Sequence, residues 1–491
     1  MTSSTAPQRR LAVVMAAVGL LAAVAAALGI GVPGTDGGHA AVDEPQYLLS
    51  ALSVWEDGNL DISDELAADR ARSYHAAELP VQTTVRPDGS QVSPHDPLLA
   101  VLLAPAVGLG GWVAAKAVLA ALAGVLAALL VWLAVRRLAV PLPLAGAVVA
   151  VAFASAPLAV YGQQVYPELP AALAVTVAVV ALTGRHGSGG TVTLLLAVVA
   201  LPWLSVKYAP VAAVLAAGWL FAQWRDGRRR EAGAALGVLG VAAAVFLVVH
   251  RAVYGGWTAY ASGDHFQTAG ELGVVGTNPD YAGRGTRVVG LLVDRDFGLV
   301  AWQPAWLLVV PGLAALPWLL PRRWPVLMAP LAVGWLVASF VALTMHGFWW
   351  PGRQVVLVLP LAVLAVAVWL THLSAVLRAP IRGWVFGAFA GLAGAGVAAY
   401  GWVLASGWTG ALTWVGAPEE AAPGVIAALR SVLPDYRNLG AADWSLHAAW
   451  VLVLIGLAAG AALLARRHVV VAPSTASLDD HHLLTTTQGA R

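Results

Sequence analysis

The chain has 491 residues, of which 59% are hydrophobic and only 11% are charged, and its net charge is +2. Soluble domains carry about 25% charged residues, so the composition excludes a string of ordinary soluble domains and predicts an all-α integral membrane protein. The sequence contains no cysteine, which excludes disulfides, thiolate metal sites and a cysteine nucleophile. With so small a net charge and no basic stripe outside short loops, nucleic acid is not expected as a partner.

Apolar segments recur along the whole chain, and a helix needs about 20 such residues to cross the hydrocarbon core of a bilayer. We predict about twelve membrane spans, at 11–32, 112–135, 142–160, 167–183, 191–203, 208–223, 233–253, 297–319, 325–345, 354–374, 383–404 and 445–465. The first apolar run is longer than the core of a signal peptide, which is about 7–15 residues. We therefore expect an uncleaved anchor.

Two apolar stretches are ambiguous by length alone. Residues 97–110 are too short to cross and fit an interfacial or re-entrant segment. Residues 191–222 are too long for one span, and we predict two short helices that turn around Pro202 and Pro210. This choice keeps the arginines that follow on the same side as those at the N terminus, as the positive-inside rule expects.

The positive-inside rule then gives an orientation in the cytoplasmic (plasma) membrane, with both termini in the cytoplasm. The predicted inner side carries a consistent set of arginines (Arg9, Arg10, Arg136, Arg137, Arg185, those in 225–230, Arg322, Arg323, Arg378, Arg382, Arg466, Arg467 and Arg491). Its acids are only Asp226, Glu231, Asp479 and Asp480. The remaining acids crowd outside or at outer helix ends, so we expect the active face to be external.

The first long outer loop, 33–96, begins with Asp43-Glu44-Pro45-Gln46-Tyr47. Pro45 fits the first turn of a helix, and an apolar face follows at helical spacing (Leu48, Leu49, Leu52 and Trp55), which predicts an interfacial helix. Adjacent carboxylates push their pKa values apart, so Asp43 or Glu44 could act as a general base. Acids are also common at helix starts for electrostatic reasons, and that alternative stays open.

A second interfacial helix is expected at 64–77, with Ser63 as its N-cap. Its charged residues Asp69, Arg70 and Arg72 would form a solvated face. The loop returns to the membrane through Ser93-Pro94-His95-Asp96-Pro97. Here His95 could orient a carboxylate, contact a phosphate, or be an ordinary polar loop residue.

Three further charged residues fall at outer ends of predicted spans. Glu168 begins one span, Lys207 lies in the turn between the two short helices and is one of only two lysines, and Arg353 follows a Trp-Trp-Pro-Gly sequence. Snorkelling is an alternative explanation for Lys207 and Arg353, but Glu168 has none. The middles of the spans carry no Asp, Glu, Lys or Arg, whereas transporters place such residues near the midplane. This pattern favours an enzyme that acts on a lipid headgroup.

The motif at 43–47 resembles the Asp-Glu-x-x-Tyr signature of the C-type (GT-C) membrane glycosyltransferases. Within that group it is most similar to the branch of protein O-mannosyltransferases and the lipid A aminoarabinose transferase. His95-Asp96-Pro97-Leu98 stands where this branch has a Lys-Pro-Pro-Leu-like return. The segments 290–299 and 351–353 resemble later segments of related bacterial members, so the resemblance spans most of 11–375.

The resemblance implies an inverting glycosyltransferase that moves a sugar from a polyprenyl phosphate carrier to a glycan, lipid or protein acceptor outside the cell. Asp43, or Glu44, would deprotonate the acceptor. Substrate and phosphate contacts would come from the remaining candidates (Tyr47, His95, Asp96, Glu168, Lys207 and Arg353). No cofactor is expected, and a divalent metal held by Asp43, Glu44 and Glu168 is only weakly indicated, because these acids are scattered in sequence.

The resemblance divides the chain into a cytoplasmic N terminus at 1–10, a GT-C-like catalytic module at 11–375 that includes the outer loops 33–96 and 254–296, C-terminal spans at 376–465 with the outer loop 405–444, and a cytoplasmic tail at 466–491. Since no large C-terminal module follows, loops 254–296 and 405–444 are expected to meet the acceptor.

The chain departs from the family pattern where His95 or Asp96 replaces the lysine of the return. It also lacks a Trp-Trp-Asp-Tyr-Gly block, which argues against an oligosaccharyltransferase. The alternatives are a transporter or flippase of lipid-linked sugars and a noncatalytic assembly factor.

Overall fold

The computed structural model describes residues 5–35, 37–76, 79, 82–83, 85–184, 187–259, 261–262, 280–342, 344–416 and 424–467. Within these residues all regular structure is helical, and extended pairing is limited to isolated bridges such as Asp61 with Val92. The predicted tail 466–491 lies outside the described residues from 468 onward. The prediction of an all-α fold is confirmed.

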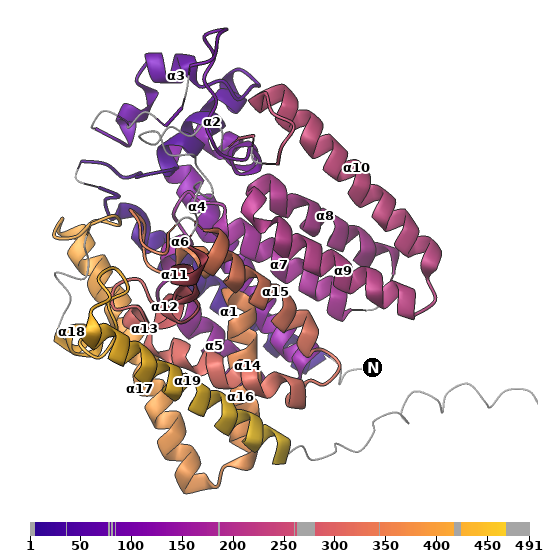
Figure 1. The fold of residues 1–491 in the computed structure, drawn as a ribbon, viewed down its shortest axis with the longest axis vertical. Helices are drawn as coiled ribbons and strands as arrows, with labels where there is room; N and C mark the ends of the chain where they lie inside the picture. The colour runs from indigo at the N-terminus through magenta and orange to yellow at the C-terminus, as the bar shows by residue number, and fades with distance from the viewer. Residues whose placement is uncertain are drawn as a thin grey trace, which may run out of the picture.

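The helices follow one another along the whole described chain (Figure 1). The first half contains α1 Thr5–Leu28, η1 Gly29–Gly31, α2 Glu44–Glu56, α3 Ser63–Ala67, η2 Arg70–Ser73, α4 Leu98–Leu138, α5 Leu142–Phe153, α6 Leu158–Tyr161, α7 Glu168–Thr183, α8 Ser188–Leu204, η3 Val206–Tyr208, α9 Ala209–Arg225 and α10 Arg229–Tyr254. The second half contains α11 Tyr281–Gly285, α12 Arg287–Val293, α13 Leu299–Trp302, η5 Pro304–Leu308, α14 Val309–Leu319, α15 Trp324–Leu336, η6 Val337–Val341, η7 Arg353–Val355, α16 Leu359–Val376, α17 Ala379–Trp408, α18 Gly424–Arg430 and α19 Ala441–Arg467.

Among the described residues, eight helices are long and apolar enough to cross a membrane. They are Ala6–Gly31, Leu98–Leu138, Val206–Arg225, Arg229–Tyr254, Trp324–Val341, Leu359–Val376, Ala379–Trp408 and Ala441–Arg467. Four shorter apolar helices, Leu142–Phe153, Glu168–Thr183, Ser188–Leu204 and Pro304–Leu319, fall on the remaining predicted spans. A multi-pass membrane protein is therefore supported, while the number of twelve spans stays a prediction.

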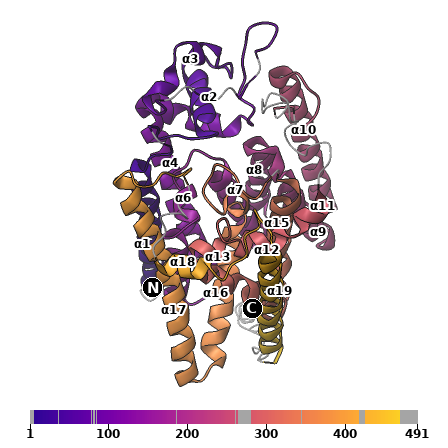
Figure 2. The same cartoon turned by 60° about the vertical axis from the view of Figure 1, so that its left-hand side comes forward.

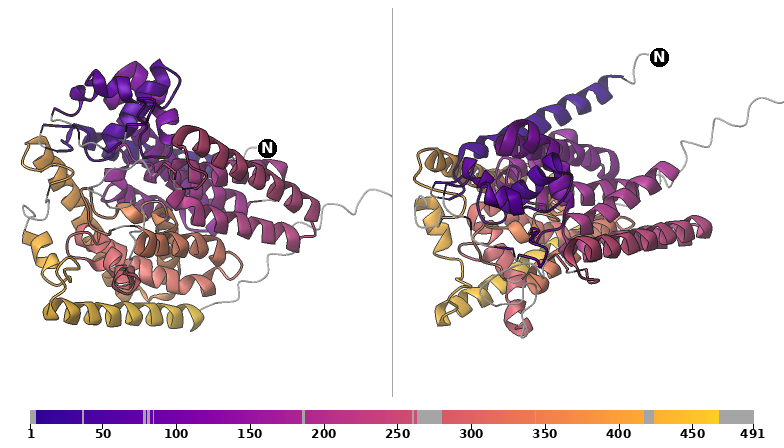
Figure 3. Two further views of the ribbon diagram at one scale, coloured as in Figure 1. Left: turned by 45° about the horizontal axis from the view of Figure 1, so that its top comes forward. Right: turned by 90° about the horizontal axis from the view of Figure 1, so that it is seen from above.

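The membrane helices pack through small residues as well as large apolar ones. A Cβ added at Gly124 of α4 would lie 2.6 Å from the backbone oxygen of Gly19 in α1, so only glycine allows these two helices to come so close. Without a hydrophobic force between helices in lipid, such close backbone contact is a main source of association. Figure 2 shows α1 rising toward α2 and α3 at one end, while α16 and α17 reach toward the other. Figure 3 shows α10 and α19 along the edges of the bundle.

The predicted short segment 97–110 forms a separate arm of α4. The backbone leaves helical geometry at Gly110 and Gly111, and Gly111 has φ +63° and ψ −157°, a conformation that is essentially restricted to glycine. The arm is thus a helix of its own, joined to the long span by a glycine kink.

The predicted turn in 191–222 is confirmed. Helix α8 ends at Leu204, Ser205 is extended with φ −166° and ψ 133°, and α9 starts at Ala209. Lys207 lies in this turn, within η3.

The first outer loop contains one predicted helix and lacks the other. Helix α2 spans Glu44–Glu56 with Pro45 in its first turn, and it packs on α4, where Trp55 covers Gly108. The helix predicted at 64–77 is wrong, because Asp69 has φ +50° and separates α3 from η2.

Ser63 is not an N-cap either. It is the first residue of α3, and its N–H donates to Asp61 Oδ1 at 3.1 Å. The side chain of Asp61 therefore accepts a hydrogen bond at the start of the helix, which is the role predicted for Ser63. Asp69, Arg70 and Arg72 are exposed, as predicted.

Candidate functional site

Four charged side chains that are distant in sequence meet beside the first turn of α2. Arg353 Nη2 donates to Asp43 Oδ2 at 2.9 Å, and Arg353 Nε donates to Glu168 Oε1 at 3.0 Å. Lys207 Nζ donates to the same Glu168 oxygen at 3.0 Å. We call Asp43, Arg353, Glu168 and Lys207 the charge chain. It contains four of the eight site residues predicted from the sequence.

Arg353 is held in place by backbone geometry and by aromatic rings. It follows Gly352, which has φ +85° and where a Cβ would lie 2.9 Å from Leu299. The guanidinium lies 3.9 Å from the centre of the Tyr166 ring and 5.3 Å from that of Trp349. A cation over an aromatic face in a desolvated site is stabilised by about 2 kcal/mol. The site is therefore a rigid cationic centre with carboxylates on two sides.

Asp43 is the partly accessible carboxylate of the charge chain, with a side chain that is 16% exposed. His95 Nε2 lies 3.8 Å from its Oδ1. Burial raises the pKa of Asp43, but the charges and hydrogen bonds of Arg353 and His95 outweigh it, so the pKa lies well below its usual value. Asp43 is ionised at neutral pH, and it is a weak proton acceptor while Arg353 holds it.

Tyr47 and His95 form one wall beside Asp43. Their ring centres are 4.5 Å apart, and His95 Nδ1 pairs with Ser93 Oγ at 2.9 Å. Burial and the negative charge of Asp43 raise the pKa of Tyr47 well above 10, so it stays a neutral phenol.

Glu44 points away from Asp43 and is fully engaged elsewhere. Its Oε2 accepts the Ala41 N–H at 3.0 Å, and its Oε1 accepts the Val165 N–H at 2.8 Å and lies 3.1 Å from Lys116 Nζ. Lys116 is completely buried and also donates to the His39 carbonyl at 2.9 Å. Sequence reasoning gave Lys116 no role, although its rarity and its place near the start of a predicted span were available signals.

Asp96 also lies outside the charge chain. Its Oδ2 accepts the Val206 N–H at 2.8 Å, and its Oδ1 lies 3.0 Å from Nε2 of His250, a fully buried histidine on α10. Asp96 thereby fixes the turn that carries Lys207. The sequence offered only a weak signal for His250, a histidine close to the outer end of a predicted span.

The three acids considered for a metal do not form a ligand set. Asp43 pairs with Arg353, Glu44 with Lys116, and Glu168 with both Arg353 and Lys207. Each carboxylate is neutralised by a cationic side chain, so the geometry gives no support to a metal at this place.

An apolar groove is lined by residues close in sequence to Glu168 and Lys207 of the charge chain. It has a volume of about 470 Å³ and lies between the two arms of α4, α7 and α8. Leu98, Pro170 and Leu204 line it, two or three positions from Asp96, Glu168 and Lys207 respectively. Leu102 and Leu196 line it too and are exposed, which leaves one side of the groove open. The groove could hold a hydrocarbon chain whose head lies toward the start of α7 and the turn at Lys207.

Two further cavities lie near Trp349, the ring beside Arg353. The first, of about 410 Å³, is lined by aromatic rings that include Phe297, Trp349 and Trp414, and it shares His346 with the second, of about 330 Å³. His346 Nε2 lies 3.3 Å from the buried Asp294.

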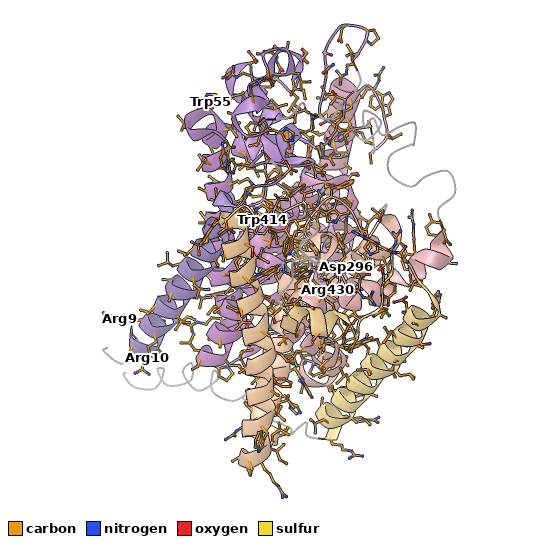
Figure 4. The ribbon with its side chains drawn as sticks, turned by 90° about the vertical axis from the view of Figure 1, so that its left-hand side faces the viewer. Arg9, Arg10, Trp55, Asp296, Trp414 and Arg430 are labelled. Carbon is orange, nitrogen blue, oxygen red and sulfur yellow. The ribbon has the colours of Figure 1, made fainter. Side chains whose placement is uncertain are left out.

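The second cavity takes lining residues from both outer loops expected to meet an acceptor: Asp280, Gly283, Arg284, Thr286 and Arg287 from 254–296, and Tyr436 and Leu439 from 405–444. The first cavity takes lining residues from 405–444 alone: Trp414, Val415, Gly416 and Arg437. These loops are tied together where Arg430 pairs with Asp296 (Figure 4).

Comparison with protein-family models, with curated proteins and with solved structures found no match. The resemblance to GT-C glycosyltransferases therefore remains a prediction from the sequence motifs.

Proposed function

We propose that the protein is an inverting glycosyltransferase that takes a sugar from a polyprenyl phosphate carrier and transfers it to an acceptor at the outer face of the cytoplasmic membrane. The observation that carries this proposal is the charge chain together with an apolar groove whose lining includes Pro170 and Leu204, two and three residues from Glu168 and Lys207. An apolar groove with cations nearby suits a lipid phosphate, which has one hydrocarbon end and one anionic end.

The donor would bind with its isoprenoid tail in the groove and its phosphate at Lys207 and Arg353. The Lys207 side chain is 28% exposed and can turn toward a ligand, whereas Arg353 is 7% exposed and fixed. Arginine pairs with phosphate through two parallel hydrogen bonds. Phosphate is a good leaving group, so the reaction needs cationic stabilisation more than a strong general acid.

Asp43 is the best candidate for the general base, because both oxygens of Glu44 are occupied. The acceptor hydroxyl would give its proton to Asp43 as its oxygen bonds to the anomeric carbon. The bond from that carbon to the phosphate oxygen breaks, and its electron pair leaves with the polyprenyl phosphate. A donor phosphate competes with Asp43 for Arg353 Nη2, and losing this cation raises the proton affinity of Asp43. The base would thus gain strength only when the donor is bound.

The acceptor would enter through the cavity lined by Phe297, Trp349 and Trp414. Trp349 belongs to this cavity and also lies against Arg353, so it connects the two regions. Aromatic walls with a few polar groups are the usual lining of small-molecule sites.

We also infer the predicted topology of twelve spans with the termini inside and the site outside. Arg9 and Arg10 lie at the end of α1 that points away from Trp55 of α2 (Figure 4), which supports placing the N terminus and the first outer loop on different sides of the membrane.

The test is sugar transfer by the purified protein in liposomes, with radiolabelled polyprenyl-phosphate sugars and a panel of glycan, lipid and peptide acceptors. We expect Asp43→Asn to lower transfer by about 10²–10⁴-fold, the usual contribution of a general base. Asp69→Asn, an exposed acid of the same loop, is the matched control and should be unchanged. Full activity of Asp43→Asn would refute the base assignment. Movement of lipid-linked sugar across vesicles without any product would favour a flippase.

A further inference from the structure

A second acidic cluster lies at the far end of α2, away from the charge chain. Asp57, which follows the last residue of α2, lies beside Asp64 and Glu65 in the first turn of α3. One carboxylate oxygen from each of the three lies within 4.8 Å of the others. No metal is expected here from the sequence motifs, which point to Asp43 instead.

Glu65 is the unusual member of this cluster. It is only 2% exposed, and neither of its carboxylate oxygens has a hydrogen-bond partner among the described residues. The hydroxyl of Tyr74, which is affected by the charge of Glu65, is also buried without a partner there. Burial of an ionised carboxylate is strongly unfavourable unless a cation or several donors compensate it.

The protein itself supplies little compensation. Arg70 interacts electrostatically with Asp64 and Glu65, but its hydrogen bond, of 2.6 Å, goes to Glu56. The three carboxylates thus converge, and that of Glu65 is buried. Among the described residues no cationic side chain lies between them.

We propose that Asp57, Asp64 and Glu65 bind a divalent cation, and that this cation is Ca²⁺. The ligands are all carboxylate oxygens, which suits a hard cation and excludes the nitrogen and sulfur sets of zinc. Asp57 and Asp64 are exposed, so water completes the coordination shell. Mg²⁺ requires near-ideal octahedral geometry, whereas Ca²⁺ accepts irregular sets of six to eight oxygens.

The loop between α2 and α3 is held in shape before any ion arrives. Asn59 Oδ1 accepts the Asp61 N–H at 2.7 Å, and Asp61 Oδ1 accepts the N–H groups of Ser63 and Gln91 at 3.1 and 2.8 Å. Ligand binding therefore needs little further ordering of the backbone.

The bound ion would join the end of α2 to the start of α3. Since α2 also carries Asp43 at its other end, the ion is expected to stabilise the first outer loop without taking part in chemistry there. This inference does not depend on the proposed glycosyltransferase activity.

The test uses terbium, a luminescent calcium analogue, on the full chain in detergent after treatment with a chelator. Trp55 lies two residues before Asp57 and serves as the antenna that excites a bound Tb³⁺. We expect saturable Tb³⁺ luminescence that Ca²⁺ displaces at lower concentration than Mg²⁺. Glu65→Gln and Asp57→Asn should lose the signal, and Asp88→Asn, an exposed acid of the same loop, should keep it.

Thermal unfolding separates loss of binding from loss of folding. Ca²⁺ should raise the Tm of the wild type but not that of Glu65→Gln, and in chelator Glu65→Gln should be about as stable as the wild type because the amide keeps the volume of the buried side chain. Tb³⁺ luminescence that persists in both variants, a wild type that gives no Ca²⁺-displaceable signal, or equal displacement by Mg²⁺ would overturn the proposal.

Discussion

Replacement of Lys116 by methionine is the sharpest test of how the start of α2 is anchored. Lys116 is completely buried, and its Nζ lies 3.1 Å from Glu44 Oε1 and 2.9 Å from the His39 carbonyl. The variant would leave the Glu44 carboxylate buried with only the N–H groups of Ala41 and Val165 as donors. We therefore expect a large loss of stability from this single change.

The magnitude follows from the geometry of the ion pair. Two unit charges 3.1 Å apart attract by about 5 kcal/mol at an effective dielectric constant of 20, and removal of one partner of a buried pair costs about 3–5 kcal/mol. The double variant Lys116→Met with Glu44→Gln removes both charges and should be more stable than Lys116→Met alone. The measurement is denaturant unfolding in detergent micelles for both single variants and the double variant.

Lys207→Met is the matched control, because it removes the other lysine of the protein. Its side chain is 28% exposed, and Glu168 keeps Arg353 as a partner, so the loss should be clearly smaller. Equal losses for the two lysine variants, or strictly additive effects of Lys116→Met and Glu44→Gln, would refute the buried-pair reasoning.

Three further outcomes are expected. The pKa of Asp43 is lower in the folded state than the unfolded value of about 3.9, so its ionised carboxylate stabilises the folded protein above that pH. The difference in unfolding free energy between wild type and Asp43→Asn should therefore be constant above about pH 5 and shrink at lower pH. Denaturation from pH 3 to 8 measures this difference. Gly111→Ala should cost about 1–3 kcal/mol, whereas Gly218→Ala, in an open helical position, should be neutral or stabilising by up to about 1 kcal/mol. Ala200→Trp, which fills the apolar groove, should raise the KM for a long-chain donor but not for a short-chain one, and Val192→Trp on the same helix should change neither.

Most of the long apolar helices could be predicted from local sequence, although the helix predicted at 64–77 was not formed. Long apolar runs fix where helices form, Pro45 starts α2, and the arginines that follow α9 favoured two short helices with Lys207 in the turn. These features depend on residues close together in the chain, so composition and spacing are enough to predict them.

The pairing of the charges could not be predicted in the same way. Asp43 and Arg353 are 310 residues apart, and no local pattern joins them. The sequence predicts Asp96 beside His95 as a candidate for phosphate contact, whereas in the structure its carboxylate accepts the Val206 N–H and lies against His250. Partners of this kind are chosen by tertiary packing, which brings distant polar groups to the same buried place.

The central claim is that a lipid phosphate binds with its tail in the apolar groove and its head at Arg353. The most direct measurement is photocrosslinking of the purified protein with a polyprenyl phosphate that carries a photoreactive group in its tail, followed by mass spectrometry. We expect labels on the groove segments 98–103, 170–177 and 193–204, competed by unlabelled polyprenyl phosphate and strongly reduced in Arg353→Met. Labels confined to other lipid-facing helices, or groove labels that neither polyprenyl phosphate nor Arg353→Met reduces, would contradict the claim.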